Sequence, residues 1–270
     1  MLRSASLRVL DDSDVAEVLT LLDSDPVTNV LIAARVQAAG LDPWRLGAEV
    51  WGYGDTGQLS ALCHAGANLA PTHCTPDAVR AFADKARRQG RRCSSIVGPA
   101  DTVQPLWEAL RRSWGPARDV RPYQPLMTIS APSTVPPDPS VRRVRPDEVD
   151  LLVPACVAMF TEEVGVSPIG GDGGVLYRSR VAELVTAGRS FARIEEGRVL
   201  FKAEIGSATE RACQVQGVWV DPARRGEGLS VAGMAAVVAL ALDAVAPVVS
   251  LYVNDYNLPA RRAYARVGFT

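Results

Sequence analysis

The residues best suited to chemistry in this chain form a basic, glycine-containing turn that follows Val218-Trp219-Val220. The turn, residues 221–230, reads Asp-Pro-Ala-Arg-Arg-Gly-Glu-Gly-Leu-Ser and leads into the apolar residues 231–242. Glycine lets backbone N–H groups approach a ligand closely, and the start of a helix leaves N–H groups that attract anions. Arg224 and Arg225 add mobile positive charge. The pattern predicts a binding site for a phosphate-bearing ligand between a strand and a helix.

A second group of candidate residues lies near the end of the sequence. Val249–Val253 is typical of a strand and Leu258–Val267 of a helix, with Asn257 just before the helix and Gly268-Phe269 just after it. Tyr264 shares its helix face with apolar residues, which is typical of a packing residue. Asn257 is either the helix cap or a ligand contact.

Three predicted strands precede the turn: Ser190–Ile194, Val199–Ile205 and Ala212–Val220. Glu195-Glu196-Gly197 is a hairpin signal between the first two. Alternation puts Leu200, Lys202 and Glu204 on one face of the middle strand. Glu204 is therefore either a carboxylate on a solvated face or a base acting through a water. By the same alternation, Gln214 and Gln216 share a face with Val218 and Val220, where they could orient substrate.

The glycine-containing turn and the segment from Val249 to Phe269 together resemble the GNAT superfamily of acyl-CoA-dependent N-acyltransferases. The family signature, Arg/Gln-x-x-Gly-x-Gly/Ala, corresponds here to Arg225–Ser230, and Ser230 takes the sixth position. Serine is small and a good helix N-cap, so we expect the turn to keep its binding function despite this difference from the signature. The resemblance covers residues 140–270. It is carried by two motifs in the right order, since Asn257, Tyr264 and Gly268-Phe269 also match the family.

The resemblance implies acetyl-CoA as co-substrate and a primary amine (protein lysine, peptide or small amine) as acceptor. It implies Tyr264 as the proton donor to the leaving thiolate, and we take Glu204 as the candidate base. The pantetheine arm would pair with the strand, and the pyrophosphate would lie on the turn. The implied cofactor-binding residues are Val218, Trp219, Val220, Arg224, Arg225, Gly226, Glu227, Gly228, Leu229, Ser230 and Asn257.

The proline-rich residues 131–140 split the chain into halves that begin alike, with Leu7-Arg8-Val9 in one and Arg142-Arg143-Val144 in the other. The halves also end alike, in a helix, a strand and a helix. We interpret this as a diverged internal duplication; two generic α/β domains are the alternative. The expected fold is α/β, with two GNAT-like domains in tandem as in actinobacterial two-domain members. Each domain would have a mixed, largely antiparallel sheet flanked by helices.

The predicted domains are a degenerate GNAT-like domain at 1–130 without an acyl-CoA loop, a linker at 131–140 and a catalytic domain at 141–270. In the first half the loop position reads His73-Cys-Thr-Pro-Asp77, where an aspartate would repel phosphate. Leu110 takes the place of Tyr264, and Val103 that of Asn257. This half is expected to shape the acceptor site, bind a regulator or stabilise its partner.

No metal site is expected. Cys63-His64 and His73-Cys74 suggest zinc by composition, but neighbouring strand residues point to opposite faces. The net charge of −1 gives no reason to expect nucleic acid. Five scattered cysteines suit a reducing cytoplasm. No signal peptide is evident in residues 1–14, and the apolar run 231–242 is too short to span a membrane. A homodimer is possible.

Two other functions stay open on the sequence: a non-catalytic acyl-CoA or metabolite sensor, and a tandem enzyme with two acyl sites. The acceptor is not defined, although Gly170-Gly-Asp-Gly-Gly174 is placed as family acceptor loops are and hints at a cationic amine. The family normally continues into one or two closing strands after Gly268-Phe269, so either this chain is shortened or something else borders the Val249–Val253 strand. Arg121–Ser130 is a candidate to border the Val249–Val253 strand instead, because an open apolar edge would invite association.

Overall fold

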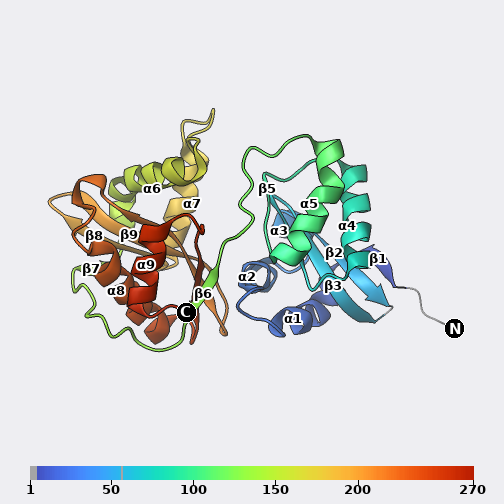
Figure 1. Cartoon of the computed structure of the whole chain (residues 1–270), viewed down its shortest axis with the longest axis horizontal. Coiled ribbons are helices and arrows are strands. Elements are labelled where there is room, and N and C mark those ends of the chain that lie inside the picture. Colours follow the sequence, from blue (N-terminus) through green and yellow to red (C-terminus); the bar gives the residue numbers. More distant parts are fainter. Residues whose placement is uncertain (1–4, 56) are drawn as a thin grey trace. The chain divides into compact units, whose positions relative to one another are not determined.

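Alternating short strands and helices build two α/β units in this computed structural model, which describes residues 5–55 and 57–270 (Figure 1). The units are Met1–Gln124 and Pro125–Thr270. Residues 1–4, part of the segment in which the sequence predicts no signal peptide, lie outside the described residues.

The sheet of the first unit has the order β1-β2-β3-β4-β5, antiparallel except for the parallel β4–β5 pair. Its strands are β1 (Ser6–Val9), β2 (Glu49–Asp55), β3 (Gln58–Ala65), β4 (Asn68–Thr72) and β5 (Ser95–Ile96). Its helices are α1 (Val15–Asp23), α2 (Val30–Ala39), α3 (Pro43–Leu46), α4 (Pro76–Gln89) and α5 (Ala100–Trp114). Because strand side chains alternate between faces, Val50 packs with α1 and α2, and Trp51 packs with α4 and α5.

The sheet of the second unit has the order β6-β11-β10-β9-β8-β7. Its strands are β6 (Leu126–Ile129), β7 (Val141–Arg143), β8 (Ser190–Glu195), β9 (Arg198–Ala208), β10 (Cys213–Val220) and β11 (Val249–Tyr252). Its helices are α6 (Val149–Val164), α7 (Val175–Thr186), α8 (Leu229–Ala244) and α9 (Leu258–Val267). Helices α8 and α9 cover one face, around Phe201, and α6 and α7 cover the other, around Cys156.

The predicted tandem arrangement is confirmed by the matching topology of the two units. Strands β7-β8-β9-β10-β11 repeat the order, directions and helix placement of β1-β2-β3-β4-β5, including one parallel pair at the same place. A local ion pair is repeated as well. Arg8 on β1 binds Asp14, and Arg142 on β7 binds Glu148, each six residues away in the 3₁₀ turn that opens the next helix.

The edge strand of the second unit comes from the segment that the sequence proposed for it. Strand β6 pairs antiparallel with β11 over four residues, and Thr128 exchanges two backbone hydrogen bonds with Thr270. The units therefore divide after Gln124 and not in the linker expected at 131–140. That segment packs within the second unit: Val135 joins its core, and the Ser133 hydroxyl donates to the Val267 carbonyl at 2.6 Å.

All five cysteines are free thiols, three of them buried. Among the described residues, no helix is long and apolar enough to span a bilayer.

Candidate acyl-donor site

The glycine-containing turn joins β10 to α8 and takes the backbone form that the sequence requires. Gly226 and Gly228 have φ values of 86° and 81°, a region that residues with a side chain rarely adopt. No other side chain would meet a Cβ at either position, so backbone conformation is what calls for glycine there. Ser230 does not cap the helix as expected, because the N-cap is Gly228 and Ser230 lies one residue inside α8.

Backbone N–H groups at this turn are available to a ligand. In the part of the chain that the structure describes, no N–H from Gly226 to Ser230 donates to a protein acceptor. The next two, of Val231 and Ala232, both donate to the Gly228 carbonyl. Helix α8 therefore begins with several open donors and the positive end of its dipole, in an exposed turn. This arrangement binds phosphate in many proteins.

The two arginines of the turn are not the mobile charges that the sequence predicts, since both have acidic partners. Arg224 Nε lies 2.8 Å from a carboxylate oxygen of Glu227. Arg225 donates from Nη2 to Glu162 on α6 at 2.7 Å and from Nε to the Val220 carbonyl at 3.2 Å. These pairs are solvent-exposed and individually weak, about 0–1 kcal/mol. A phosphate could therefore replace the carboxylates at small cost.

Strand β10 carries a bulge at Gly217, and this changes which residues share a face. The register passes from Gln216 opposite Glu204 to Trp219 opposite Lys202, which leaves one extra residue on β10. Gly217 takes φ 61° at this point. The expectation that Gln216 shares a face with Val218 and Val220 is therefore wrong. The two valines pack with the core under α8, whereas the Gln216 amide bonds Glu204 on the α6 side.

The bulge coincides with a strip of unpaired strand edge. Strand β10 pairs with β11 only at Cys213 and Gln214, although β10 continues to Val220. Strand β11 is covered on its other side by β6. From Val215 to Val220 the β11-facing edge of β10 therefore has no partner strand in the described structure. This strip ends directly at the turn with the open N–H groups.

Tyr264 lies on α9 and is 8% exposed. Its ring packs edge-on against Phe269, with ring centres 6.0 Å apart. No hydrogen bond from its hydroxyl is found among the described residues. Burial, aided by the nearby charge of Glu163, raises the pKa of Tyr264 well above its ordinary value. The phenol is therefore protonated at neutral pH, as a proton donor must be, and the packing interpretation also describes its ring.

Asn257 caps α9, because its Oδ1 accepts the backbone N–H of Ala260 at 3.2 Å. Of the two roles considered for Asn257, the structure therefore shows the helix cap. The residue is exposed.

The carboxylate of Glu204 lies in a buried polar cluster and not on a solvated face. Its Oε2 lies 3.1 Å from Lys202 Nζ, and its Oε1 accepts the Gln216 amide at 2.9 Å. Lys202 is 1% exposed and also lies 3.2 Å from Cys156 Sγ. Burial alone would lower the pKa of Lys202, but the Glu204 carboxylate outweighs it and the pKa is raised.

Two features of α6 and the following loop were missed by sequence reasoning. Glu162 bridges the turn and the strand, since it accepts from Arg225 and, at 3.3 Å, from the Trp219 indole. Asp172, in the glycine-rich loop between α6 and α7, accepts the backbone N–H groups of Gly174 and Leu176. Its charge therefore supports the start of α7. The role of Glu162 has no signature in sequence, because it depends on which elements become neighbours, whereas an aspartate just before a helix is a local signal.

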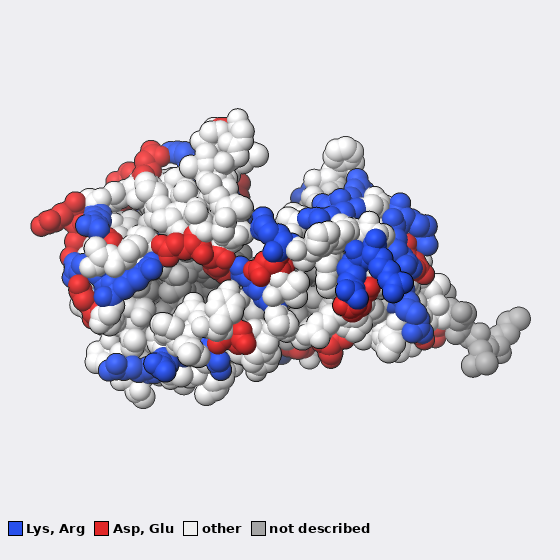
Figure 2. Space-filling view, turned by 45° about the horizontal axis from the view of Figure 1, so that its top comes forward, with Lys and Arg blue, Asp and Glu red and all other residues white. Residues whose placement is uncertain are grey.

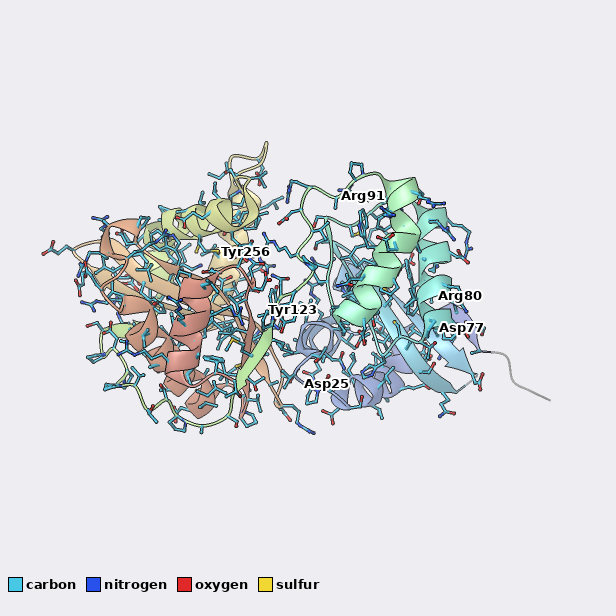
Figure 3. The ribbon with its side chains drawn as sticks, in the orientation of Figure 1. Asp25, Asp77, Arg80, Arg91, Tyr123 and Tyr256 are labelled. Carbon is cyan, nitrogen blue, oxygen red and sulfur yellow. The ribbon has the colours of Figure 1, made fainter. Side chains whose placement is uncertain are left out.

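Among its described residues, the first unit has no counterpart to this turn. Strand β4 ends at Thr72 and α4 begins at Pro76, so the connection is short, and the Thr75 hydroxyl accepts the N–H of Ala78. Asp77 lies in the first turn of α4 and pairs with Arg80 (Figure 3). Lys and Arg side chains gather over the α4 and α5 side of this unit (Figure 2). Several of them pair with acids three residues away on the same helix.

The cysteine and histidine pairs of the first unit are engaged in other contacts. His64 contacts Arg35 at 3.3 Å, and His73 contacts the Asn29 amide at 2.8 Å. No group of three or more metal-ligating side chains occurs within the described ranges.

Comparison with known proteins decides the family of the second unit. Residues 179–269 match the family model described as Acetyltransferase (GNAT) family. The second unit contains a GNAT domain. Members of this family are acetyltransferases that use acetyl-CoA, the donor that the sequence predicts. Residues 48–152 match a domain of unknown function, DUF4081, which extends from β2 of the first unit into α6 of the second.

Solved structures share the fold of the entire chain. A tandem GNAT protein from the clavulanic acid biosynthesis pathway superposes with a TM-score of 0.57 at 16% identity, covering 98% of this chain and 95% of that one. A GCN5-related N-acetyltransferase from Sphaerobacter thermophilus gives 0.55 at 16% identity, with 98% and 92% covered. A GNAT-family acetyltransferase from Colwellia psychrerythraea gives 0.52 at 13%, with 98% and 96% covered. No curated protein gives a significant match.

Proposed function

We propose that the GNAT domain of this protein transfers an acetyl group from acetyl-CoA to a primary amine on a protein lysine, a peptide or a small molecule. The first unit would not take part in the chemistry. The observation that carries the proposal is the unpaired β10 edge from Val215 to Val220, which leads directly into the open N–H groups of Gly226–Ser230. An extended amide-containing arm that ends in a pyrophosphate has the shape and hydrogen-bonding pattern to fill both.

In this proposal the acceptor amine attacks the thioester carbonyl, so a C–N bond forms and the C–S bond breaks. The leaving thiolate takes a proton from the Tyr264 hydroxyl, and the phenolate regains one from the attacking nitrogen, which carries an extra proton once the C–N bond has formed, or from solvent. The cofactor-binding residues remain those predicted, with main-chain groups of Val218–Val220 on the arm and the turn on the phosphates. For Asn257 we propose a contact through its amide nitrogen, since its oxygen caps α9.

Glu204 stays the candidate base from sequence, and its surroundings define what that role requires. Both of its oxygens already accept hydrogen bonds, from Lys202 and Gln216. A water would have to share one of them to carry a proton from the amine. The pair with Lys202 supports a positioning role equally well, and the two roles differ in the kinetic constant that they control.

The test is to incubate the purified protein with acetyl-CoA and a panel of primary amines, and to measure free thiol and acetylated product. We expect thiol release that depends on the amine and is lost in Tyr264→Phe. Acetyl-CoA binding without turnover of any amine would instead support the sensor alternative. Absence of binding would remove both.

A further inference from the structure

The buried cluster beneath the bulge of β10 offers an inference that rests on the proposed function and deepens it. The cluster consists of Cys156 and Met159 on α6, Lys202 and Glu204 on β9, and Gln216 and Gly217 on β10. Lys202 is among the largest fully buried side chains of the chain. A lysine is almost never fully buried unless it is paired, and nothing in the transfer reaction requires this ammonium.

The backbone of the bulge rests directly on the ion pair. A Cβ added at Gly217 would lie 3.2 Å from both Glu204 Cδ and Lys202 Nζ, and 3.1 Å from Met159 Cε. Gly217 also has a φ of 61°, which disfavours a side chain. A side chain at this position would therefore be strained, and it would force the charged pair and Met159 to move by a few tenths of an ångström.

Gln216 ties the bulge to the same pair from the strand itself. Its amide donates to Glu204 at 2.9 Å, and its side chain lies flat over Gly206, where any Cβ would overlap it. Glycines at 206 and 217 thus make room for one polar connection between β9 and β10. On the α6 side, Lys202 Nζ also lies 3.2 Å from Cys156 Sγ, which joins the helix to the cluster.

The bulge lies within the strip that would receive the acyl donor. Bulges bend a strand and increase its twist, and β10 loses its pairing with β11 shortly before this one, after Gln214. We infer that Lys202 and Glu204 are positioning residues, whose buried pair holds the Gly217 bulge and so keeps the β10 edge open for an acyl-CoA arm.

The decisive comparison is between Glu204→Gln and Lys202→Met/Glu204→Gln, each titrated with coenzyme A by calorimetry and assayed for turnover. The single substitution leaves a buried ammonium without its counter-charge, so we expect coenzyme A to bind at least tenfold more weakly. In the double variant the ammonium is gone as well, and the amide oxygen introduced at position 204 can still accept from Gln216. We therefore expect the double variant to recover most of the affinity.

The two roles of Glu204 give opposite results in this experiment. If Glu204 is only the base, Glu204→Gln binds coenzyme A like the wild type, loses kcat with a changed pH profile, and is not rescued by the second substitution. That result would overturn the inference and leave the proposed function standing. If the wild type itself binds no coenzyme A, both the proposed function and this inference are wrong.

Gly217→Ala serves as the second variant in case Glu204→Gln does not fold. We expect it to bind coenzyme A at least tenfold more weakly, and wild-type affinity would contradict the inference. Glu148→Gln is the matched control, because it breaks another buried carboxylate–cation contact, with Arg142, in the same unit but on β7 and its following turn. It should lower thermal stability and leave the dissociation constant for coenzyme A unchanged.

Discussion

The two strand-to-helix connections, β4 to α4 and β10 to α8, occupy equivalent places in two copies of one topology and differ in what they offer a ligand. In the first unit a threonine side chain satisfies the start of the helix, and Asp77 stands in its first turn. In the second, glycine caps the helix and leaves the N–H groups open. The same topology therefore contains one helix, α4, whose first N–H groups are capped by a side chain, and another, α8, whose first N–H groups are open to an anion.

The largest expected effect tests whether only the second unit carries the chemistry. Tyr264→Phe should lower kcat by about 10²–10⁴-fold, the usual contribution of a positioned proton donor, with coenzyme A affinity unchanged. Tyr53→Phe, on β2 of the first unit, is the control and should leave kcat unchanged. Substantial activity remaining in Tyr264→Phe would indicate either a second active unit or another donor.

The same tyrosine predicts a dependence on pH. Its pKa is raised by burial, so the neutral phenol favours the folded state. That contribution is fully present below the ordinary value near 10 and is lost as the pH rises from there toward the raised pKa. Alkaline unfolding of the wild type should therefore be steeper than that of Tyr264→Phe, measured by circular dichroism between pH 9 and 11 (roughly one unit either side of the ordinary value).

An aspartate at the start of α8, like the one at the start of α4, should remove binding of the acyl donor. Gly228→Asp adds backbone strain and places a carboxylate near the phosphates, where like charges cost several kcal/mol. We expect coenzyme A to bind about 100-fold or more weakly, measured by calorimetry. Gly197→Asp, at φ 73° in the β8–β9 hairpin turn, carries the same strain without a phosphate nearby. If both variants lose affinity equally, strain and not charge is responsible.

The repeated ion pair should contribute more stability in the second unit than in the first. Glu148 is buried and accepts from both terminal nitrogens of Arg142, at 2.8 and 2.7 Å, which lowers its pKa from 4.5 to about 2. Glu148→Gln should lower the unfolding free energy by about 1.5–3 kcal/mol, the usual range for hydrogen bonds to charged groups. Asp14→Asn, which has one 2.7 Å contact to Arg8, should cost about 0–1 kcal/mol.

Trp219 makes this comparison measurable, because the other four tryptophans all belong to the first unit. Its emission during urea unfolding reports the second unit, with Trp219→Phe as the blank. The stability from Glu148 is present above about pH 4.5 and is lost as the pH falls toward 2. Equal losses for Asp14→Asn and Glu148→Gln would show that the two copies use the pair identically.

The smallest effect concerns the arginines. Arg225→Gln should weaken coenzyme A binding only about 3–10-fold, since one exposed contact is worth about 1 kcal/mol and its present partner Glu162 must first be released. Arg80→Gln, in an exposed pair of the first unit, should change nothing. A 100-fold loss for Arg225→Gln would mean that side-chain charge dominates the backbone N–H groups.

Much of the fold was predictable because its signals are local. Helix α9 is found at the expected Leu258–Val267, and the Glu196-Gly197 turn has the two positive φ values that its hairpin needs. The glycine-containing turn before α8 was predictable for the same reason, since its glycine spacing and the helix start involve adjacent residues. The edge strand β6 was found by a different argument, from the cost of leaving β11 uncovered.

The surroundings of the site were less predictable, because they depend on contacts between distant segments. Strict alternation placed Gln216 on the wrong face, although an isolated glycine inside a strand, here Gly217, is a known sign of a bulge. Nothing in sequence tells that Lys202 is buried or that Glu162 lies beside Arg225. The unit boundary was missed because proline content marks stiffness, and a stiff segment can pack within a unit as well as between two.

The pairing of β6 with β11 has a consequence for how the protein is made. Strand β6 is synthesised about 120 residues before β11. At about 5–20 residues per second, the interval is roughly 6–24 s. During that time β6 has no partner strand, while the first unit is already complete. The second sheet can close only after β11 and Thr270 have emerged. Chaperones that hold short apolar strands would therefore act on the β6 segment during the second half of synthesis.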